Sequence, residues 1–335
     1  MKSQNRIYLY DNLKFVLIVL VVLGHFINGY TTSSRMFSGL FQFIYAFHMP
    51  LFLFISGHFH KNNKPFLKIF SLCCIGFVIK IVLALFTLIV NHSAPSFSLL
   101  SDHGLPWYMF VLAAHTLISY LCRNMNKRFL MIMAILLACF VGYDAQTRDY
   151  LYLSRILVFY PFYLLGEMIP QDGLLRIHGC KWAKAFGLIP LGAWIFLCFF
   201  RLDAVDYLLP LFTGRNPFFV NAIFEKWGFL YRLACYAITL VVGFAVFCLI
   251  PNRQFPIVTH FGSRTLQVYF WHWPVLMIFN KLGIGAFLCS SPLGKLCWLL
   301  CGVTVTCLLS LKPFGFPVTT IIKNCTTHQN KGVAN

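Results

Sequence analysis

The chain has 335 residues, of which 59% are apolar, 18% are aromatic and only 11% are charged, and its mean hydropathy is +0.75. Soluble domains carry about 25% charged residues, so this composition excludes an ordinary soluble enzyme and predicts a polytopic membrane protein. The formal net charge of +18 would also suit a nucleic-acid-binding protein, and only the distribution of the basic residues can separate these two interpretations.

Apolar segments long enough for a bilayer about 30 Å thick recur along the chain and predict an all-α bundle of about ten transmembrane helices. The segments 128–143 and 184–200 are short for a span, and the last segment contains Pro313 and Pro317 and is expected to end near Leu311. No repeat and no separate soluble domain is visible, so residues 1–335 are expected to form one membrane domain. The expected spans are 12–30, 39–59, 66–90, 105–122, 128–143, 151–169, 184–200, 228–250, 264–281 and 294–322.

Basic residues are unevenly divided between the two sides of these spans. If the N-terminus is cytoplasmic, the inner segments hold more than twice as many Lys and Arg residues as the outer segments. This positive-inside bias predicts a cytoplasmic N-terminus and a multi-pass protein of the cell membrane. The membrane topology therefore explains the excess of basic residues, and we expect these residues to contact anionic membrane lipid rather than nucleic acid. The first apolar segment lacks a small-residue cleavage site, so we do not expect it to be a signal peptide.

The 13 cysteines do not predict a metal site. Most of them lie within apolar spans, where cysteine packs as a small hydrophobic residue, and there is no Cys-x-x-Cys motif. The pairs Cys73-Cys74 and Cys297…Cys301 lack the neighbouring histidines of a typical zinc site. We therefore expect no bound metal.

The first expected span carries Asp11, Lys14 and His25 on an otherwise apolar helix. Eleven residues of α-helix make about three turns, so Lys14, Val21 and His25 share one face, with Asp11 close to it. Ionisable groups at such depths are costly and usually face the interior of a bundle or a wet cavity. Asp11 lies too far along the helix to orient His25, and we expect it to pair with Lys14 or another basic residue of the inner side.

The second expected span contains Pro50, which should kink it, and Ser56-Gly57, which should let another helix approach closely. His48 lies near the middle of this span. It could be a packing residue bonded to a carbonyl, or it could line a site. The inner end of the span carries His58, followed by Lys64 and Lys68. These basic groups could be ordinary inner charge, or they could bind the phosphates of a donor.

Several motifs, in this order along the chain, resemble those of the membrane-bound acyltransferase 3 family, and most of all its branch of fucose 4-O-acetylases and capsule or exopolysaccharide O-acetyltransferases. Many relatives carry arginine at the position of Lys14, and lysine keeps the charge but loses the bidentate geometry. The motifs are Tyr10-Asp11-Asn12 with Lys14…Gly24-His25, Phe47-His48-Met49-Pro50-Leu51-Phe52 with Ile55-Ser56-Gly57, Pro106-Trp107-Tyr108, Arg155 with Phe159-Tyr160-Pro161-Phe162-Tyr163-Leu164-Leu165-Gly166, and Gly262-Ser263-Arg264-Thr265-Leu266…Tyr269…His272.

The resemblance implies transfer of an acetyl group from acetyl-CoA, as a substrate rather than a bound cofactor, to a sugar hydroxyl of a surface polysaccharide or its lipid-linked precursor. His25 would be the general base, and the donor would meet Lys14, Asp11, His58, Lys64 and Lys68. Some relatives carry an additional extracellular esterase-like domain. None is seen before Asn335, so we expect transfer to finish within the membrane domain or with another protein.

The acceptor would lie nearer the outer face, where aromatic and polar groups bind sugars. Trp107 and Tyr108 could equally form an interfacial aromatic belt, and Arg155 and Arg232 could extend outward to water. His272 could line the cavity or bond to a carbonyl. The candidate acceptor residues are Arg155, Trp107, Tyr108, His48, His272 and Arg232, with Lys80, His115 and Glu167 as lesser candidates.

Two other classes of function remain open. A transporter or flippase of a lipid-linked sugar would explain charged residues in spans, although no inverted repeat is visible. A non-catalytic membrane partner or sensor is the other. The sequence does not identify the sugar or its hydroxyl, a longer acyl group, a non-sugar acceptor, or the oligomeric state, a homo-oligomer included.

Overall fold

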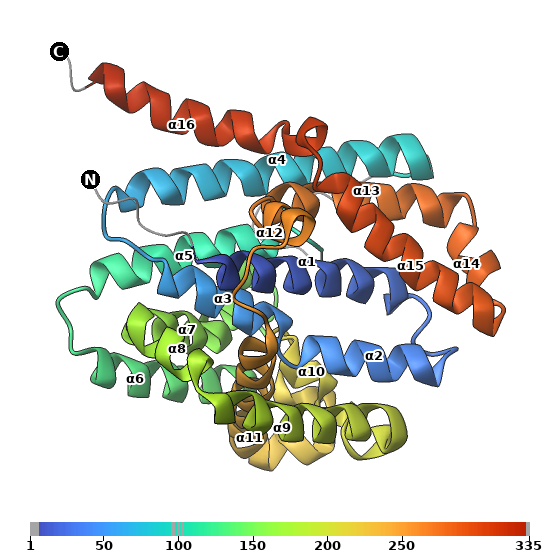
Figure 1. Ribbon diagram of the computed structural model, residues 1–335, viewed down its shortest axis with the longest axis horizontal. Coiled ribbons are helices and arrows are strands. Elements are labelled where there is room, and N and C mark those ends of the chain that lie inside the picture. The colour runs from blue at the N-terminus through green and yellow to red at the C-terminus, as the bar shows by residue number, and fades with distance from the viewer. Residues whose placement is uncertain (1–6, 95–97, 99–100, 102–103, 333–335) are drawn as a thin grey trace.

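The computed structural model describes residues 7–94, 98, 101 and 104–332, and its regular structure within these ranges is entirely helical (Figure 1). The expectation of an all-α protein is therefore confirmed. The α-helices are α1 (Tyr8–Asn28), α2 (Arg35–Tyr45), α3 (His48–His58), α4 (Pro65–Asn91), α5 (Trp107–Leu121), α6 (Lys127–Phe140), α7 (Leu153–Met168), α8 (Gln171–Gly179), α9 (Lys181–Phe200), α10 (Leu209–Phe212), α11 (Ala222–Leu249), α12 (Pro256–Gly262), α13 (Thr265–Lys281), α14 (Ile284–Cys289), α15 (Pro292–Leu309) and α16 (Val318–Gly332).

Six helical segments are long and apolar enough to cross a membrane, so the chain is a multi-pass membrane protein by length and composition. Each of the ten expected spans coincides with a helical segment, but α5, α6, α7 and α13 have only 14 to 17 residues. The count of ten spans is therefore not established. The six segments are Tyr8–Asn28, Arg35–His58, Pro65–Asn91, Trp182–Phe200, Ala222–Leu249 and Pro292–Leu309.

The structure corrects the length of one expected span and confirms the interruption expected in another. The expected short span 184–200 is wrong in length, because α9 runs over 20 residues from Lys181 to Phe200. The interruption expected around Pro313 and Pro317 is confirmed, because α15 ends at Leu309 and α16 begins at Val318.

Helix α1 lies in the middle of the bundle, with α4 on one side of it and α9 and α11 on the other (Figure 1). It packs against α2, α3, α12, α13 and α15. Gly262 closes the contact with α12, since a Cβ at this position would collide with the main-chain carbonyl of Asp11. The Asn12 amide donates hydrogen bonds to the carbonyls of Pro251 and Arg253, both at 2.9 Å. A buried polar group on α1 thus anchors the loop that precedes α12.

The second expected span consists of two helices rather than one kinked helix. The break falls at Ala46-Phe47, before Pro50, which occupies the first turn of α3, where a missing N–H costs little. The Ala46 carbonyl freed by this break accepts a 2.6 Å hydrogen bond from Thr239 of α11. This satisfies a main-chain group that would be costly to leave unpaired within a bilayer. The prediction of a kink at Pro50 is therefore corrected to a break just before it.

Helices α3 and α7 pack closely against each other. Gly57 lies against the Tyr163 carbonyl and Gly166 lies against the Phe54 carbonyl, and a Cβ at either position would collide with these oxygens. The close approach predicted for Ser56-Gly57 is confirmed. Because α7 carries Arg155 near its first turn, this contact fixes that guanidinium relative to α1 and α3.

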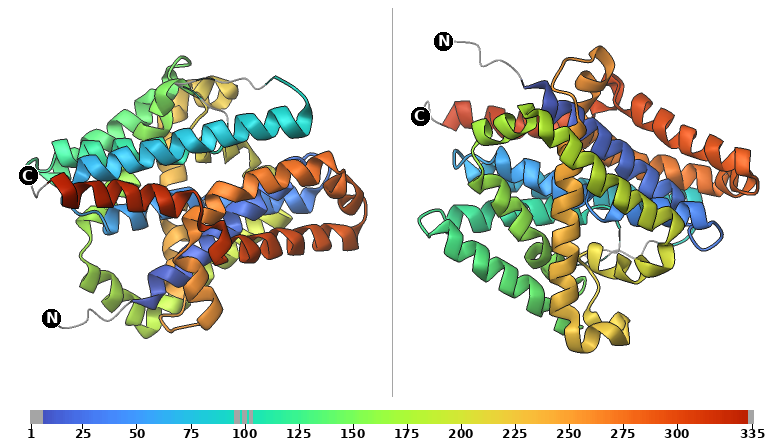
Figure 2. Two further views of the ribbon diagram at one scale, coloured as in Figure 1. Left: turned by 90° about the horizontal axis from the view of Figure 1, so that it is seen from above. Right: turned by 60° about the horizontal axis from the view of Figure 1, so that its bottom comes forward.

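The predicted inner segments meet at one end of the bundle. At the start of α1, the Tyr10 hydroxyl lies 2.9 Å from His58 Nε2 at the end of α3. The other His58 ring nitrogen lies 3.3 Å from the Gly166 carbonyl near the end of α7. The right view of Figure 2 shows α11 running upright across the bundle. The structure thus agrees with a division into two faces, while the assignment of one face to the cytoplasm remains a prediction.

Candidate active site

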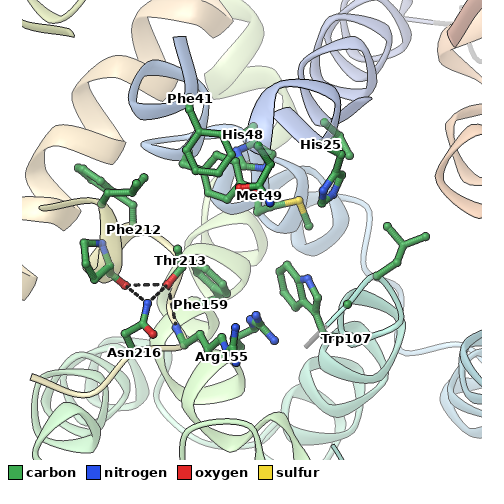
Figure 3. Close-up of a pocket in the computed structure, with 18 of the residues that line it drawn as sticks. His25, Phe41, His48, Met49, Trp107, Arg155, Phe159, Phe212, Thr213 and Asn216 are labelled. Carbon is green, nitrogen blue, oxygen red and sulfur yellow. Dashed lines mark hydrogen bonds between the residues drawn. The ribbon is translucent and has the colours of Figure 1, made fainter. Parts of the chain in front are cut away.

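A cavity of about 340 Å³, named here the histidine cavity, opens beside the last turn of α1. Figure 3 shows His25, His48 and Met49 on one side of it and Arg155, Thr213 and Asn216 on the other. Its lining comes from α1, α2, α3, α5, α7, α13 and the segment around α10, so it is assembled from residues distant in the sequence. The lining residues used below are His25, His48, Trp107, Arg155, Thr213, Arg215, Asn216 and Tyr269.

A second cavity of about 170 Å³, named here the lysine cavity, lies along the same face of α1. Lys14 and Ile18 line it, and Val21, Met49 and Tyr269 line both cavities. The shared face predicted for Lys14, Val21 and His25 is therefore confirmed. Lys14 and His25, two of the ionisable residues of α1, thus face two adjoining cavities.

Two imidazoles, those of His25 and His48, line one side of the histidine cavity, and the ring of His272 lies next to His25. The ring centroids of His25 and His272 are 5.2 Å apart, and the indole of Trp273 meets the His25 ring edge-on at 4.9 Å. His48 Nδ1 donates to the Ile44 carbonyl at 2.7 Å, and His272 Nδ1 donates to the Val268 carbonyl at 3.0 Å. A carbonyl can only accept, so in each neutral ring the proton is on Nδ1 and the lone pair is on Nε2.

These contacts resolve the two interpretations of both histidines. His48 bonds to a carbonyl and also lines the histidine cavity. His272 is fully buried, bonds to a carbonyl, and is not among the residues that line the cavity. It lies behind His25 rather than at the cavity surface. Among the described residues, its Nε2 has no hydrogen-bond partner.

Arg155 brings a buried positive charge to the histidine cavity. The residue is only 6% exposed, and its guanidinium carbon lies 4.7 Å from the centre of the Trp107 ring. Trp107 in turn stacks on Phe159 at 5.8 Å. The position of Trp107 in the cavity wall makes it more than a belt residue, and the burial of Arg155 shows that it does not extend outward to water.

Tyr108 and Arg232, two other predicted acceptor residues, lie elsewhere. Tyr108 lines the lysine cavity, where its hydroxyl is 3.3 Å from that of Ser56. Arg232 is 1% exposed, donates to the Leu211 carbonyl at 2.6 Å and lies over the Phe218 ring at 5.5 Å. It lines neither cavity and holds the chain around α10 against α11.

The predicted donor residues are divided between two places. Lys14 Nζ lies 2.8 Å from the Asp11 carboxylate, which confirms their pairing, and Lys14 lines the lysine cavity. His58, Lys64 and Lys68 line neither cavity. His58 bonds to Tyr10, whereas Lys64 is exposed just before α4.

A separate ionic cluster lies close to His58 and Lys68. The Glu167 side chain is 7% exposed, lies 3.3 Å from Lys127 Nζ and is 3.9 Å from His60 Nε2. The Tyr163 hydroxyl lies 2.8 Å from His60 Nδ1. Burial lowers the pKa of His60, and the nearby Glu167 opposes that shift. The cluster joins α6, α7 and the turn after α3 at the end of the bundle where α1 begins.

The sequence did not single out several residues of the histidine cavity. Thr213, Arg215 and Asn216 follow α10, in a segment assigned to no span, and nothing in the local sequence links them to His25. Arg215 forms a two-point ion pair with Asp149, at 2.7 and 2.8 Å. Tyr269 had a signal, because it lies three residues before His272 and therefore near it on the same helix.

Comparison with known proteins identifies the family of this chain. The acyltransferase domain model of the acyltransferase 3 family matches residues 7–312. A segment of 59 residues is 44% identical to nodulation protein NolL of Sinorhizobium fredii strain NGR234, a match that covers 17% of this chain and 16% of that protein. No solved structure matches. The family match spans nearly the whole chain, including both cavities, and the chain belongs to the acyltransferase 3 family of membrane-bound acyltransferases.

Proposed function

We propose that this protein is an O-acetyltransferase that moves acetyl from cytoplasmic acetyl-CoA to a sugar hydroxyl of a surface polysaccharide or its lipid-linked precursor, with His25 as general base. The observation that carries the proposal is the position of His25 in a cavity that adjoins the cavity of Lys14. Membership of the acyltransferase 3 family supports acyl transfer as the reaction class. The identities of the donor, the acceptor and the base are what we propose here.

The two cavities suggest how donor and acceptor meet. Acetyl-CoA would enter past Lys14, whose ammonium would contact a phosphate or the pantetheine arm, and its thioester would reach the region shared by both cavities near Val21, Met49 and Tyr269. The acceptor would occupy the histidine cavity from the other face. A reporter fused after Lys64 should then read cytoplasmic, and one placed at Asn216 should read external.

The chemical step needs one base and no covalent enzyme intermediate. The ring nitrogen of His25 takes the hydroxyl proton as the acceptor oxygen attacks the thioester carbonyl carbon. The tetrahedral intermediate then collapses, the C–S bond breaks, and the thiolate leaving group takes the proton from the His25 imidazolium. Acceptor ester and free CoA thiol are the products, and the base returns to its neutral form.

His272 is suited to hold the base in the required tautomer. Its Nε2 is a buried lone pair beside the His25 ring, and no Asp or Glu is among the described residues that line the cavity. A small rotation would let His25 donate an N–H to His272 Nε2. The other His25 nitrogen would then carry its lone pair toward the acceptor, a role that a carboxylate fills in many triads.

The decisive experiment compares wild-type protein and His25→Ala, purified and reconstituted, in an acetyl-CoA transfer assay and by NMR of surface-glycan O-acetyl content in cells. The variant should lose transfer by a factor on the order of 10²–10⁴ at matched protein level. Normal O-acetyl content with wild-type turnover in the variant would disprove the assignment. A protein without any transfer activity would favour the transporter or sensor alternatives.

A further inference from the structure

The histidine cavity contains a buried positive charge for which the described residues provide no hydrogen-bonding partner. Arg155 is 6% exposed, and its guanidinium makes no hydrogen bond to any described residue, with Nε and Nη1 both buried. Contact with the Trp107 ring offsets only part of the free energy that it costs to remove a charged group from water. The folded protein therefore retains buried guanidinium N–H groups that an added anion could satisfy.

The acidic group whose charge acts on Arg155 is Asp149, and Arg155 shares it with Arg215. Asp149 is engaged by both Nε and Nη2 of Arg215, at 2.7 and 2.8 Å. Arg215 lines the cavity, but its charge is balanced by that carboxylate. The lining residues of the described chain include two arginines and no Asp or Glu. The wall around Arg155 is thus positive, in a place where a neutral sugar would need only neutral hydrogen-bonding groups.

We propose that the acceptor carries an anionic group, a carboxylate or a phosphate, which binds to Arg155 while the hydroxyl to be acylated faces His25. This inference rests on the proposed function. Figure 3 shows Arg155 on the side of the cavity that faces His25 and His48. An anion on the guanidinium would therefore fix one end of the acceptor and present its other end to the base. Trp107, packed beside the guanidinium, offers a face for the sugar ring.

Additional groups around Arg155 fit the same ligand. Asn216 and Thr213 lie on the same side of the cavity and hydrogen-bond to each other at 3.0 Å, which fixes a polar wall near the guanidinium. A cavity of about 340 Å³ falls within the size range of small-molecule sites, roughly 300–1,000 Å³. Arginine binds both carboxylate and phosphate through paired N–H groups. The anion could therefore be the acid group of a uronic acid or the phosphate that links a sugar to a lipid.

The test measures binding of three probes to the purified protein in detergent by calorimetry, with no turnover required. The probes are methyl glucuronide for the carboxylate, glucose 1-phosphate for the phosphate and methyl glucoside as the neutral match. At least one anionic probe should bind about tenfold or more tightly than the glucoside. Arg155→Gln should abolish this preference, and Arg155→Lys should keep part of it, since the charge remains without the planar geometry.

Arg201→Gln is the matched control, because it removes an exposed charge at the end of α9 that lines neither cavity. It should leave the preference unchanged. Equal binding of the glucoside, a preference that survives in Arg155→Gln, or no binding by either anionic probe would overturn the inference. The proposed function is tested by a different result. If anions bind through Arg155 but acetyl transfer does not depend on His25, the proposed enzyme activity is refuted while the anion site stands. Thermal unfolding of each variant confirms that it is folded.

Discussion

The imidazole rings of His25 and His272 lie 5.2 Å apart, centroid to centroid, and the buried Nε2 of His272 has no hydrogen-bond partner among the described residues. The Val268 carbonyl accepts from His272 Nδ1 at 3.0 Å and so fixes which nitrogen of this ring can serve His25. A neutral acceptor in this position can set the orientation of the base without adding a negative charge to an apolar region. His272 would then act through His25, as a positioning residue.

The first prediction separates this role from simple packing. His272→Gln places an amide oxygen near the position of Nε2, whereas His272→Asn keeps only the contact near Nδ1. We expect His272→Asn to lower kcat by on the order of 10–100-fold, less than the 10²–10⁴-fold expected for loss of a general base, with KM for acetyl-CoA unchanged. His272→Gln should recover much of the loss. Equal kcat in the two variants, or a change confined to KM, would contradict the positioning role.

The second prediction concerns the ionic cluster of Glu167, Lys127 and His60. Glu167 is 7% exposed and lies 3.3 Å from Lys127 Nζ, so Glu167→Gln replaces a paired buried carboxylate with a neutral amide. A hydrogen bond to a charged group contributes about 1.5–3 kcal/mol, and we expect the thermal midpoint in detergent to fall measurably. Asp172→Asn, an exposed acid at the start of α8, is the matched control. Equal shifts in both variants would show that the cluster adds no stability.

The third prediction follows from the lowered pKa of His60. Burial makes the folded state bind this proton more weakly than the unfolded chain does. The stability that depends on neutral His60 is therefore complete above the ordinary histidine pKa of about 6.5 and is lost as the pH falls below it. Wild-type protein should show a falling thermal midpoint between about pH 7.5 and 5.5. His60→Asn should show a smaller fall, and identical curves for the two proteins would refute this assignment.

The face of α1 could be predicted from the sequence because it depends only on helical periodicity. Lys14, Val21 and His25 lie where a 3.6-residue repeat puts them. Gly57 could be predicted for a similar reason, since a small residue in an apolar helix indicates close packing. Both predictions depend on local sequence patterns, and the tertiary structure agrees with these patterns.

Arg155, on the far wall of the histidine cavity, was a candidate because it lies in a family motif, but the rest of that wall is formed by tertiary contacts that no local pattern indicates. By composition alone, Arg155 and Arg232 look alike, as single arginines in apolar segments. One lines the cavity without a hydrogen bond in the described chain, whereas the other donates to the Leu211 carbonyl. Asn216 reaches the cavity from a segment without helical periodicity. The break before Pro50 was also missed, since it depends on Thr239 of α11 bonding to the Ala46 carbonyl.

The last prediction concerns Lys14, which pairs with Asp11 at 2.8 Å and also lines the lysine cavity. Its side chain is 28% exposed, so the ammonium can contact a donor while it keeps the carboxylate. If Lys14 binds a phosphate or the pantetheine arm, Lys14→Ala should weaken acetyl-CoA binding about 10–100-fold, the equivalent of one hydrogen bond to a charged group. Lys14→Arg should keep most activity because the charge remains.

The double variant Lys14→Ala with Asp11→Asn distinguishes donor binding from mere pairing with Asp11. If the lysine only neutralises Asp11, Lys14→Ala alone leaves a carboxylate near the inner boundary without its ammonium partner and lowers protein yield, and the double variant restores both yield and activity. If Lys14 binds the donor, the double variant recovers yield but not affinity, because no positive charge remains in the lysine cavity at that position. Acetyl-CoA affinity in the single and double variants decides between these outcomes. Unchanged affinity in well-folded Lys14→Ala protein would exclude the donor role and leave His25 as the one residue of α1 assigned to the chemistry.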